Sequence, residues 1–286
     1  MSTALAFPWP AGPKSRVPSL DVLARIIEET DLGDGVRVAG VLVRGRFLTA
    51  ALADALHAHY FRGDPGHAVP KVRYSAFGTE SGGRRGLDFC QRLADTLEPY
   101  LFRRDGWQFS YRTSEGVPSF VVTAGGAVDG NQASCFLHLQ PGTAPDLFAR
   151  IVTALDGYGL GFRAELAGDP EACRRTDAAV LTVRRDDLPA VTRVAVRLGE
   201  RAPFALAPSV PAFTRQIAPG VAVADQPGPG TPFGRHRCRL VAAGLVAAGH
   251  GADATARRHA VLGYLIAAGL DPAAPHLNPG SPEFRI

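Results

Sequence analysis

Apolar residues follow a helical spacing in several segments of this sequence. Leu20, Leu23, Ile26 and Ile27 lie three or four positions apart behind Ser19, a residue type that favours helix N-caps, and they predict a first helix. The same spacing predicts further helices over residues 48–60, 89–97, 147–155, 188–198, 235–248 and 253–268.

Between these helices lie short runs that are rich in β-branched and other apolar residues. They predict strands over residues 36–43, 107–113, 119–123, 134–139, 161–166, 178–183 and 221–224. Glycine turns separate the second, third and fourth runs, which is typical of an antiparallel meander. Because strands and helices do not alternate strictly, the pattern predicts an α+β fold with a central, mainly antiparallel sheet flanked by helices.

The composition is that of a packed protein. Of the 286 residues, 46% are hydrophobic and 20% are charged, which excludes a mainly disordered chain. Residues 1–18 mix prolines with little periodicity, so we expect a flexible N-terminal arm followed by a single domain over residues 19–286. The longest apolar stretch, 240–249, is far shorter than the ~20 residues of a membrane span, and no basic-then-apolar leader is present. We therefore expect a cytoplasmic protein without a membrane partner.

Motifs for common cofactors are absent from the sequence. It contains no G-x-x-x-x-G-K-[ST], H-E-x-x-H or G-x-S-x-G motif. The cysteines Cys90, Cys135, Cys173 and Cys238 are far apart in the chain and form no pair at metal-ligand spacing, so we expect buried thiols. The sequence thus predicts neither a metal nor a cofactor.

The chain is basic, with a formal net charge of +4, and its positive charge is almost entirely arginine. Arginine forks suit phosphate and carboxylate, but the aromatic residues are not interleaved with them as base-stacking platforms, so nucleic acid is not an expected partner. Lys14 and Lys71 are the only lysines among 31 basic residues. Because an amine loses its proton more readily than a guanidinium, Lys71, in a cationic segment that begins with Arg62, is a candidate general base. The alternative is a solvated lysine on a loop.

A group of cations opens one predicted helix. Arg235, His236, Arg237 and Arg239 lie on its first turns, where free backbone N–H groups and arginine side chains favour an anion. Pairing of these arginines with carboxylates elsewhere in the chain explains them equally well.

Two arginine–carboxylate pairs accompany the predicted strands. Arg163 and Glu165 share one face of the strand over 161–166, and Arg175 and Asp177 directly precede the strand over 178–183. These residues form either structural ion pairs or a phosphate site in which the carboxylate orients the arginine.

An ordered set of segments carries a resemblance to a known family. The segments are Tyr60–Gly63, Gly161–Leu166, Arg175–Leu181, Pro219–Val221, Phe233–Arg237 and Pro275–Ser281. In order and spacing they resemble the type III effector HopA-like family, over roughly residues 40–286. The arginine-rich composition and the lack of a secretion-like leader suit the branch of that family encoded in bacterial gene clusters for class V lanthipeptides and thioamitides.

The resemblance implies a lyase that acts on a ribosomally made precursor peptide. Such an enzyme eliminates phosphate from phosphoserine or phosphothreonine and leaves dehydroalanine or dehydrobutyrine. The implied partners are the precursor peptide and the aminoglycoside-phosphotransferase-like kinase that phosphorylates it, with a cyclase or a cysteine decarboxylase as a further partner. No cofactor is implied.

On this hypothesis Lys71 takes the Cα proton and His236 gives a proton to the departing phosphate. The phosphate and the enolate are bound by Arg62, Arg163, Arg175, Arg235 and Arg237, with Glu165 and Asp177 in support. Glu165 stands where many relatives have a lysine. If that lysine is the base in those relatives, either its role has moved to Lys71 here or the substrate differs. The alternative function is a non-catalytic adaptor that presents the phosphopeptide or its leader to a kinase or cyclase, through an exposed edge of the central strands.

Overall fold

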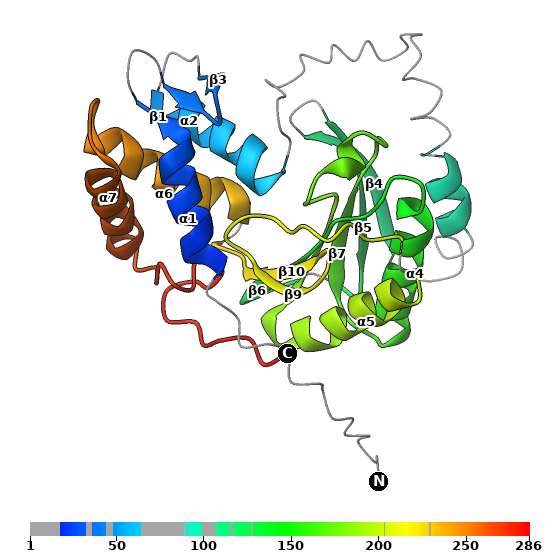
Figure 1. Ribbon diagram of the computed structural model, residues 1–286. Coiled ribbons are helices and arrows are strands. Elements are labelled where there is room, and N and C mark those ends of the chain that lie inside the picture. Colours follow the sequence, from blue (N-terminus) through cyan, green and yellow to red (C-terminus); the bar gives the residue numbers. More distant parts are fainter. Residues whose placement is uncertain are drawn as a thin grey trace.

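A computed structural model of the chain shows a sheet-centred part and a helical part that pack side by side (Figure 1). The structure describes residues 18–32, 36–43, 48–63, 89, 91–98, 107–114, 117–126, 128–202, 204–228 and 230–286. Residues 1–17 of the predicted arm, Lys71 and Cys90 lie outside the described residues. Cys135, Cys173 and Cys238 are buried free thiols, as predicted.

A seven-stranded sheet forms the centre of the fold, with the strand order β4-β5-β7-β8-β6-β10-β9. Its strands are β4 (Gln108–Ser114), β5 (Val117–Ala124), β6 (Gln132–Leu137), β7 (Phe162–Ala167), β8 (Ala179–Arg184), β9 (Arg215–Ala218) and β10 (Val221–Asp225). Every neighbouring pair is antiparallel, which confirms the predicted fold class.

The strand order corrects the predicted meander. β4 and β5 form a hairpin as expected, but β6 pairs with β8 and β10 instead of with β5. Chain neighbours are therefore not sheet neighbours at this point, because β7 and β8 insert between β5 and β6. The edge strand β9 was not predicted, and its residues are half-buried or exposed, without the alternation that marks a strand in sequence.

One face of the sheet is apolar and is covered by α4 (Ala144–Gly157) and α5 (Leu188–Glu200). Strand alternation produces this face, since Phe162, Ala164 and Leu166 of β7 are buried and the residues between them are not fully buried. Short 3₁₀ turns, η2 (Ala172–Arg174) and η3 (Arg185–Asp187), lie before β8 and before α5.

The opposite face carries polar residues and is called the polar face below. The strand register places in one row Gln108, Thr123, Arg163, Thr182 and Ser134. The neighbouring row consists of Ser110, Val121, Glu165, Val180 and Phe136. Phe136 and Val180 pack into the core of the helical part, so the helices cover the polar face at the β6 end.

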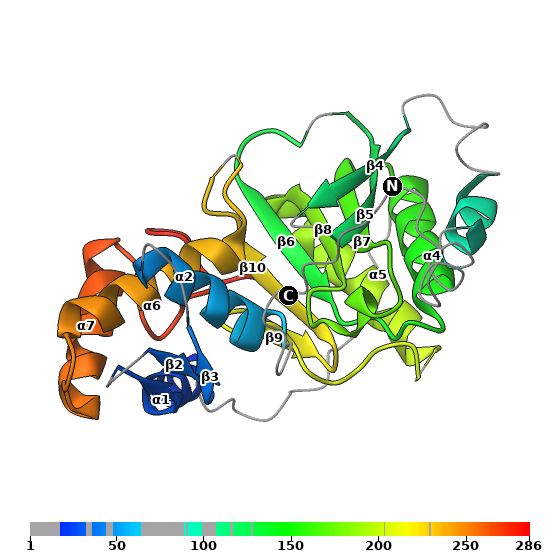
Figure 2. The ribbon, with the colours of Figure 1, turned by 90° about the horizontal axis from the view of Figure 1, so that it is seen from above.

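The helical part joins segments from both ends of the sequence. Its elements are α1 (Pro18–Glu29), α2 (Leu48–Leu56), the π-helical turn η1 (His57–Phe61), α6 (Phe233–Ala248) and α7 (Ala254–Ala267). Seen from above, these helices gather at the β10 side of the sheet, away from α4 and α5 (Figure 2). α6 approaches η1 so closely that a Cβ atom at Gly234 would lie 2.5 Å from the Phe61 ring. None of the described helices is long and apolar enough to span a membrane.

The first predicted strand is a small hairpin. β1 (Thr30–Asp31), β2 (Arg37–Val38) and β3 (Val41–Leu42) form a three-stranded antiparallel sheet. The turn between β2 and β3 has positive φ at both Ala39 (48°) and Gly40 (80°), as two-residue hairpin turns require. The continuous strand predicted over residues 36–43 is therefore wrong, because apolar residues on both sides of Gly40 obscured the turn.

Candidate functional site

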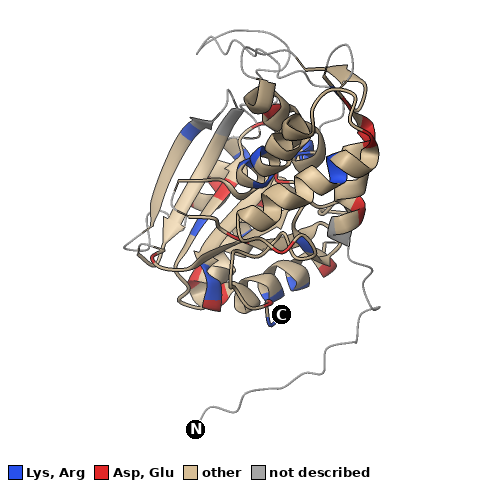
Figure 3. Cartoon of the chain, turned by 90° about the vertical axis from the view of Figure 1, so that its left-hand side faces the viewer, with Lys and Arg blue, Asp and Glu red and all other residues tan. Residues whose placement is uncertain are grey.

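The sheet, η1 and α6 bring several of the predicted site residues into contact. Figure 3 shows basic and acidic positions interspersed over the helices that face the viewer. Charge distribution on this side therefore does not locate a binding site, and the candidate site is defined by contacts among individual charged side chains.

Asp177 is the centre of one such cluster. Arg175 donates hydrogen bonds from Nε and Nη2 to the two carboxylate oxygens, at 2.8 and 2.9 Å. Arg62 approaches from η1, with its Nε 3.7 Å from Oδ2 of Asp177. The three side chains keep only 10–19% of their surface exposed. They are called the Asp177 cluster below.

Backbone contacts hold the two halves of the Asp177 cluster together. The backbone N–H of Thr176 donates to the carbonyl of Arg62 (3.0 Å), and the Thr176 hydroxyl donates to the carbonyl of Phe61. Gly63 continues the chain with a φ of +66°, and a Cβ there would lie 3.0 Å from the Thr176 methyl group. The segment before β8 is thus fixed to the end of η1, although 115 positions separate Phe61 from Thr176.

Opposing effects set the charge of Asp177. Burial alone raises the pKa of its carboxyl, but the charge and hydrogen bonds of Arg175, with the charges of Arg62 and His57, lower that pKa to about 2. Asp177 is therefore ionised at neutral pH. The cluster of two guanidinium groups and one carboxylate then has a net charge of +1, which favours an anion in contact with it.

Arg163, Glu165 and Ser119 form a second group, on the polar face. Arg163 Nη2 lies 3.1 Å from Oε2 of Glu165, and the Ser119 hydroxyl donates to Oε1 at 2.9 Å. The arginine and the glutamate are about one-third exposed, so this pair is open to solvent. Both arginine–carboxylate pairs expected from the sequence are thus present as ion pairs.

The start of α6 is occupied by contacts within the chain. Arg235 pairs with Asp54 of α2 at 2.6 Å, so intramolecular pairing accounts for this cation. Arg237 Nη1 donates to Nδ1 of His236 (2.6 Å), and a nitrogen that accepts a hydrogen bond carries no proton. Burial, with the charges of Arg237 and Arg239, lowers the pKa of His236, which favours its neutral form.

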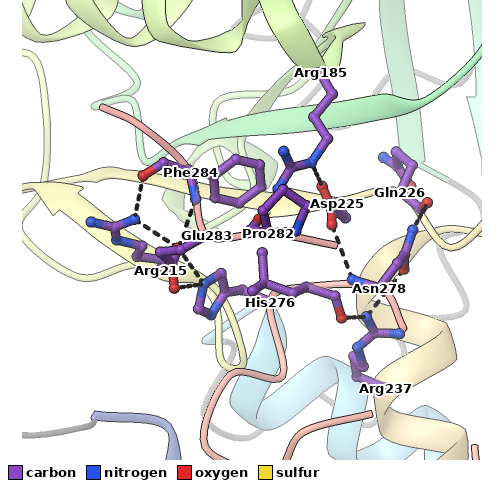
Figure 4. A network of polar contacts seen from close by, with 11 residues as sticks. Arg185, Arg215, Asp225, Gln226, Arg237, His276, Asn278, Pro282, Glu283 and Phe284 are labelled. Atoms are coloured by element: carbon purple, nitrogen blue, oxygen red, sulfur yellow. Dashed lines mark hydrogen bonds and ion pairs between the residues drawn. The ribbon is translucent and has the colours of Figure 1, made fainter. Parts of the chain in front are cut away.

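Arg237 is almost fully buried and holds the C-terminal segment (Figure 4). Its guanidinium donates to the carbonyls of Pro275 (2.7 Å) and Leu277 (2.9 Å). Asp225 accepts from the backbone N–H of Asn278 (3.0 Å) and from Arg185 (2.7 Å) in the same network. The segment with the sequence Pro-His-Leu-Asn-Pro-Gly-Ser, which contributed to the resemblance, is therefore a fixed part of the fold.

Arg237→Met is expected to lower the free energy of unfolding by about 2 kcal/mol, because buried carbonyls lose their donors. Urea unfolding measures this loss, and limited proteolysis of the C-terminal segment should become faster. Arg239→Met, an exposed position on the same helix, is the matched control. Equal stability of the two variants would contradict the role given to Arg237.

Two histidines near the Asp177 cluster were not singled out from the sequence. His57 is buried in η1, stacks on Phe61 with ring centroids 5.1 Å apart, and acts electrostatically on Asp177. His138 follows β6 and donates from Nε2 to the carbonyl of Arg174 at 3.0 Å. His138 is a single histidine next to a strand, and the spacing of two between His57 and His59 places them on different helix faces, so no local motif marks either site residue.

The predicted site residues thus fall into three places. Arg62, Arg175 and Asp177 come together, Arg163 and Glu165 form their own pair on the polar face, and Arg235, His236 and Arg237 lie at the start of α6. Lys71 lies outside the described residues. In the part of the chain that the structure describes, no group of three or more His, Cys, Asp or Glu side chains is arranged to hold a metal ion.

Comparisons with known proteins agree with this architecture. Two solved structures of effector proteins, from Pseudomonas syringae pv. tomato strain DC3000 and pv. syringae strain 61, are similar to the chain with TM-scores of 0.61 and 0.57, each at 14% identity. The matches cover 91% and 92% of this chain and 97% and 99% of those chains. No curated protein sequence matches the chain. The HopA1 effector protein family matches residues 109–277, more than half of the sequence, and the chain therefore belongs to that family.

Proposed function

We propose that this chain is a phosphoserine and phosphothreonine lyase that acts on a ribosomally made precursor peptide after a partner kinase has phosphorylated it. The observation that carries the proposal is the Asp177 cluster, in which two arginines that are far apart in sequence contact the same carboxylate. Arginine forks bind phosphate through paired N–H donors, and their charge stabilises a departing phosphate.

The proposed reaction breaks the Cα–H and Cβ–O bonds, and it forms a bond between the base and the proton and a second bond between Cα and Cβ. A base takes the Cα proton, a carbon–carbon double bond forms between Cα and Cβ, and phosphate leaves Cβ with the pair of electrons from the C–O bond. Arg62 and Arg175 stabilise the negative charge that moves onto the phosphate. Asp177 fixes the orientation of Arg175 and reduces the repulsion between the two guanidinium groups.

Lys71 remains the proposed base. It follows Gly63, the anchored end of the described η1 segment, by eight positions, and eight residues of extended chain reach about 26 Å. Chain length therefore allows the amine to approach the Asp177 cluster. Among the lysines and arginines, it is also the one outside the N-terminal arm whose side chain loses its proton more readily than a guanidinium.

Two histidines, His236 and His57, are candidates for the residue that gives a proton to the departing phosphate. The sequence favours His236, but its neighbours Arg237 and Arg239 disfavour the charged form that gives up a proton. His57 lies near Asp177 and acts electrostatically on its carboxylate, so it is the second candidate. His57→Gln and His236→Gln should therefore be compared for the rate of elimination, and the larger loss identifies the donor.

Mass spectrometry tests the proposal most directly. The purified chain is incubated with a phosphothreonine peptide, alone and together with the partner kinase, and we expect each modified residue to lose the mass of one phosphoric acid. Binding without any loss of mass in both incubations would overturn the lyase and would support the adaptor instead. Neither binding nor elimination would overturn both.

Phosphate binding at the Asp177 cluster gives an independent prediction. Inorganic phosphate should raise the melting temperature, since a ligand at ten times its Kd stabilises the folded state by about 1.4 kcal/mol. Arg62→Gln should remove most of that increase, whereas Arg258→Gln, at an exposed position of α7, should leave it intact. The shift is measured by calorimetry against chloride at equal ionic strength. An equal shift in wild type and Arg62→Gln would contradict phosphate binding at this cluster.

A further inference from the structure

The two edges of the seven-stranded sheet differ in how they are protected. β9 has four residues, its pairing with β10 contains a register shift, and Arg215 at its start binds Glu283 and the Phe284 carbonyl of the C-terminal segment. Bulges, short strands and covering segments are the usual ways to prevent strand addition at a sheet edge. The β9 edge thus carries all three.

The β4 edge has none of these features among the described residues. Its seven residues pair with β5 in an unbroken register from Gln108–Thr123 to Ser114–Val117, and it contains no proline. No described strand pairs with its other side. A regular edge strand of this length presents a row of N–H and C=O groups along that side, which is a template for an incoming strand.

Side chains along β4 indicate what such a strand would carry. Arg112 lies on the polar side of the strand, opposite Ser119 of β5, and it is exposed. No carboxylate among the described residues pairs with it. Tyr111 on the other side of the strand is 55% exposed and contacts the Phe120 ring edge-on. An extended peptide with an acidic side chain on one face and an apolar one on the other would complement both residues.

We propose that the β4 edge binds an extended, acidic segment of the precursor peptide by strand addition, with a carboxylate beside Arg112. The identity of the partner rests on the proposed function, whereas the binding mode rests on the edge itself. Backbone pairing supplies a binding mode that tolerates different sequences, and Arg112 adds a preference for acidic ones.

The strand order sets how far this segment lies from the reacting residue. An added strand is four inter-strand steps from β8, through β4, β5 and β7, and Asp177 lies two positions before β8. At about 4.8 Å per step the separation is roughly 19 Å, or about six residues of extended peptide. The β4 edge therefore binds a segment distinct from the residue that loses phosphate, at least about six positions away from it.

Alternate N-methylation tests the backbone pairing. The probe is a capped octapeptide of alternating threonine and glutamate, and its binding to the full chain is followed by fluorescence anisotropy and by hydrogen exchange of residues 107–114. Only alternate N–H groups of an added strand face the edge, so methylating one set should weaken binding about tenfold and methylating the other set should be tolerated. About three amides of β4 should become protected. Equal effects of both methylated sets, or no protection over 107–114, would overturn the proposal.

Charge reversal tests the role of Arg112. Arg112→Glu should weaken binding of the glutamate probe about threefold to tenfold, whereas Arg258→Glu on α7 should leave it unchanged. Equal weakening in both variants would show only the effect of net charge and would overturn the assignment of the carboxylate to Arg112. The probe carries no phosphate, so its binding is independent of the elimination reaction. If wild type fails to eliminate phosphate from a phosphothreonine peptide, the lyase is overturned but strand addition at the β4 edge is not. If the probe fails to bind at the β4 edge, strand addition is overturned but the lyase is not.

Discussion

Asp177→Asn is expected to lower the free energy of unfolding at pH 7 by about 3 kcal/mol. Removing one partner of a buried ion pair leaves the other charge without compensation, which costs about 3–5 kcal/mol. Here two guanidinium groups lose the carboxylate between them, and we expect the lower end of the range because they keep 15% and 19% of their surface exposed. Urea unfolding of wild type and variant measures the difference.

The dependence of this difference on pH identifies its cause. The folded-state pKa of Asp177, about 2, lies below the ordinary value of about 3.9, so its stabilisation is complete above pH 5 and is lost as the pH falls. About half of that contribution should be gone at pH 3. Glu171→Gln, which removes an exposed pair with Arg174, is the control and should change stability by less than about 1 kcal/mol. A loss in Asp177→Asn that stays constant from pH 7 to pH 3 would show that packing, and not charge, is responsible.

Local patterns were sufficient to predict most elements of the fold. Phe162–Ala167 and Ala179–Arg184 alternate between buried and partly exposed residues as their sequences indicate, and α5 lies where its apolar stripe predicted a helix. The contacts that failed to follow from the sequence are long-range. The position of β6 between β8 and β10 depends on pairing across about fifty and ninety positions, and no local spacing encodes such a partner.

The same limit applies to the candidate site. Spacing of two along the chain was enough to place Arg175 with Asp177 and Arg163 with Glu165. It was not enough to bring Arg62 to Asp177, because that contact depends on the hydrogen bonds of Thr176 to the end of η1. A π-helical turn continues the apolar pattern of α2 without a break, so η1 was predicted as ordinary helix. Turns of this kind are frequent at functional sites.

The cations at the start of α6 show why a charge pattern alone does not define a binding site. Three arginines on the first turns of one helix suggested an anion, and the repulsion among them requires compensating charges or acceptors. In the structure Asp54 neutralises Arg235, and backbone carbonyls of the C-terminal segment surround Arg237. The compensation comes from segments that lie about 180 positions before and 40 positions after this turn.

Lys71→Arg is expected to reduce the rate of elimination on the order of a hundredfold or more while leaving binding of the phosphorylated peptide nearly normal. Arginine keeps the positive charge and the approximate length of lysine, but its pKa above about 12 prevents it from serving as a base near neutral pH. Loss of a general base has an effect of this size. Single-turnover elimination and peptide affinity should be measured separately, so that chemistry and binding are distinguished.

The other lysine of the chain supplies the matched control for this substitution. Lys14→Arg makes the same chemical change in the predicted N-terminal arm and should leave both rate and affinity at wild-type values. Near-wild-type turnover of Lys71→Arg would refute Lys71 as the base while the lyase itself stood. An equal loss of elimination rate in both variants would show that the effect is not specific to Lys71. A wild-type chain that binds the phosphopeptide without eliminating phosphate would favour the adaptor, since binding needs no amine that can lose its proton.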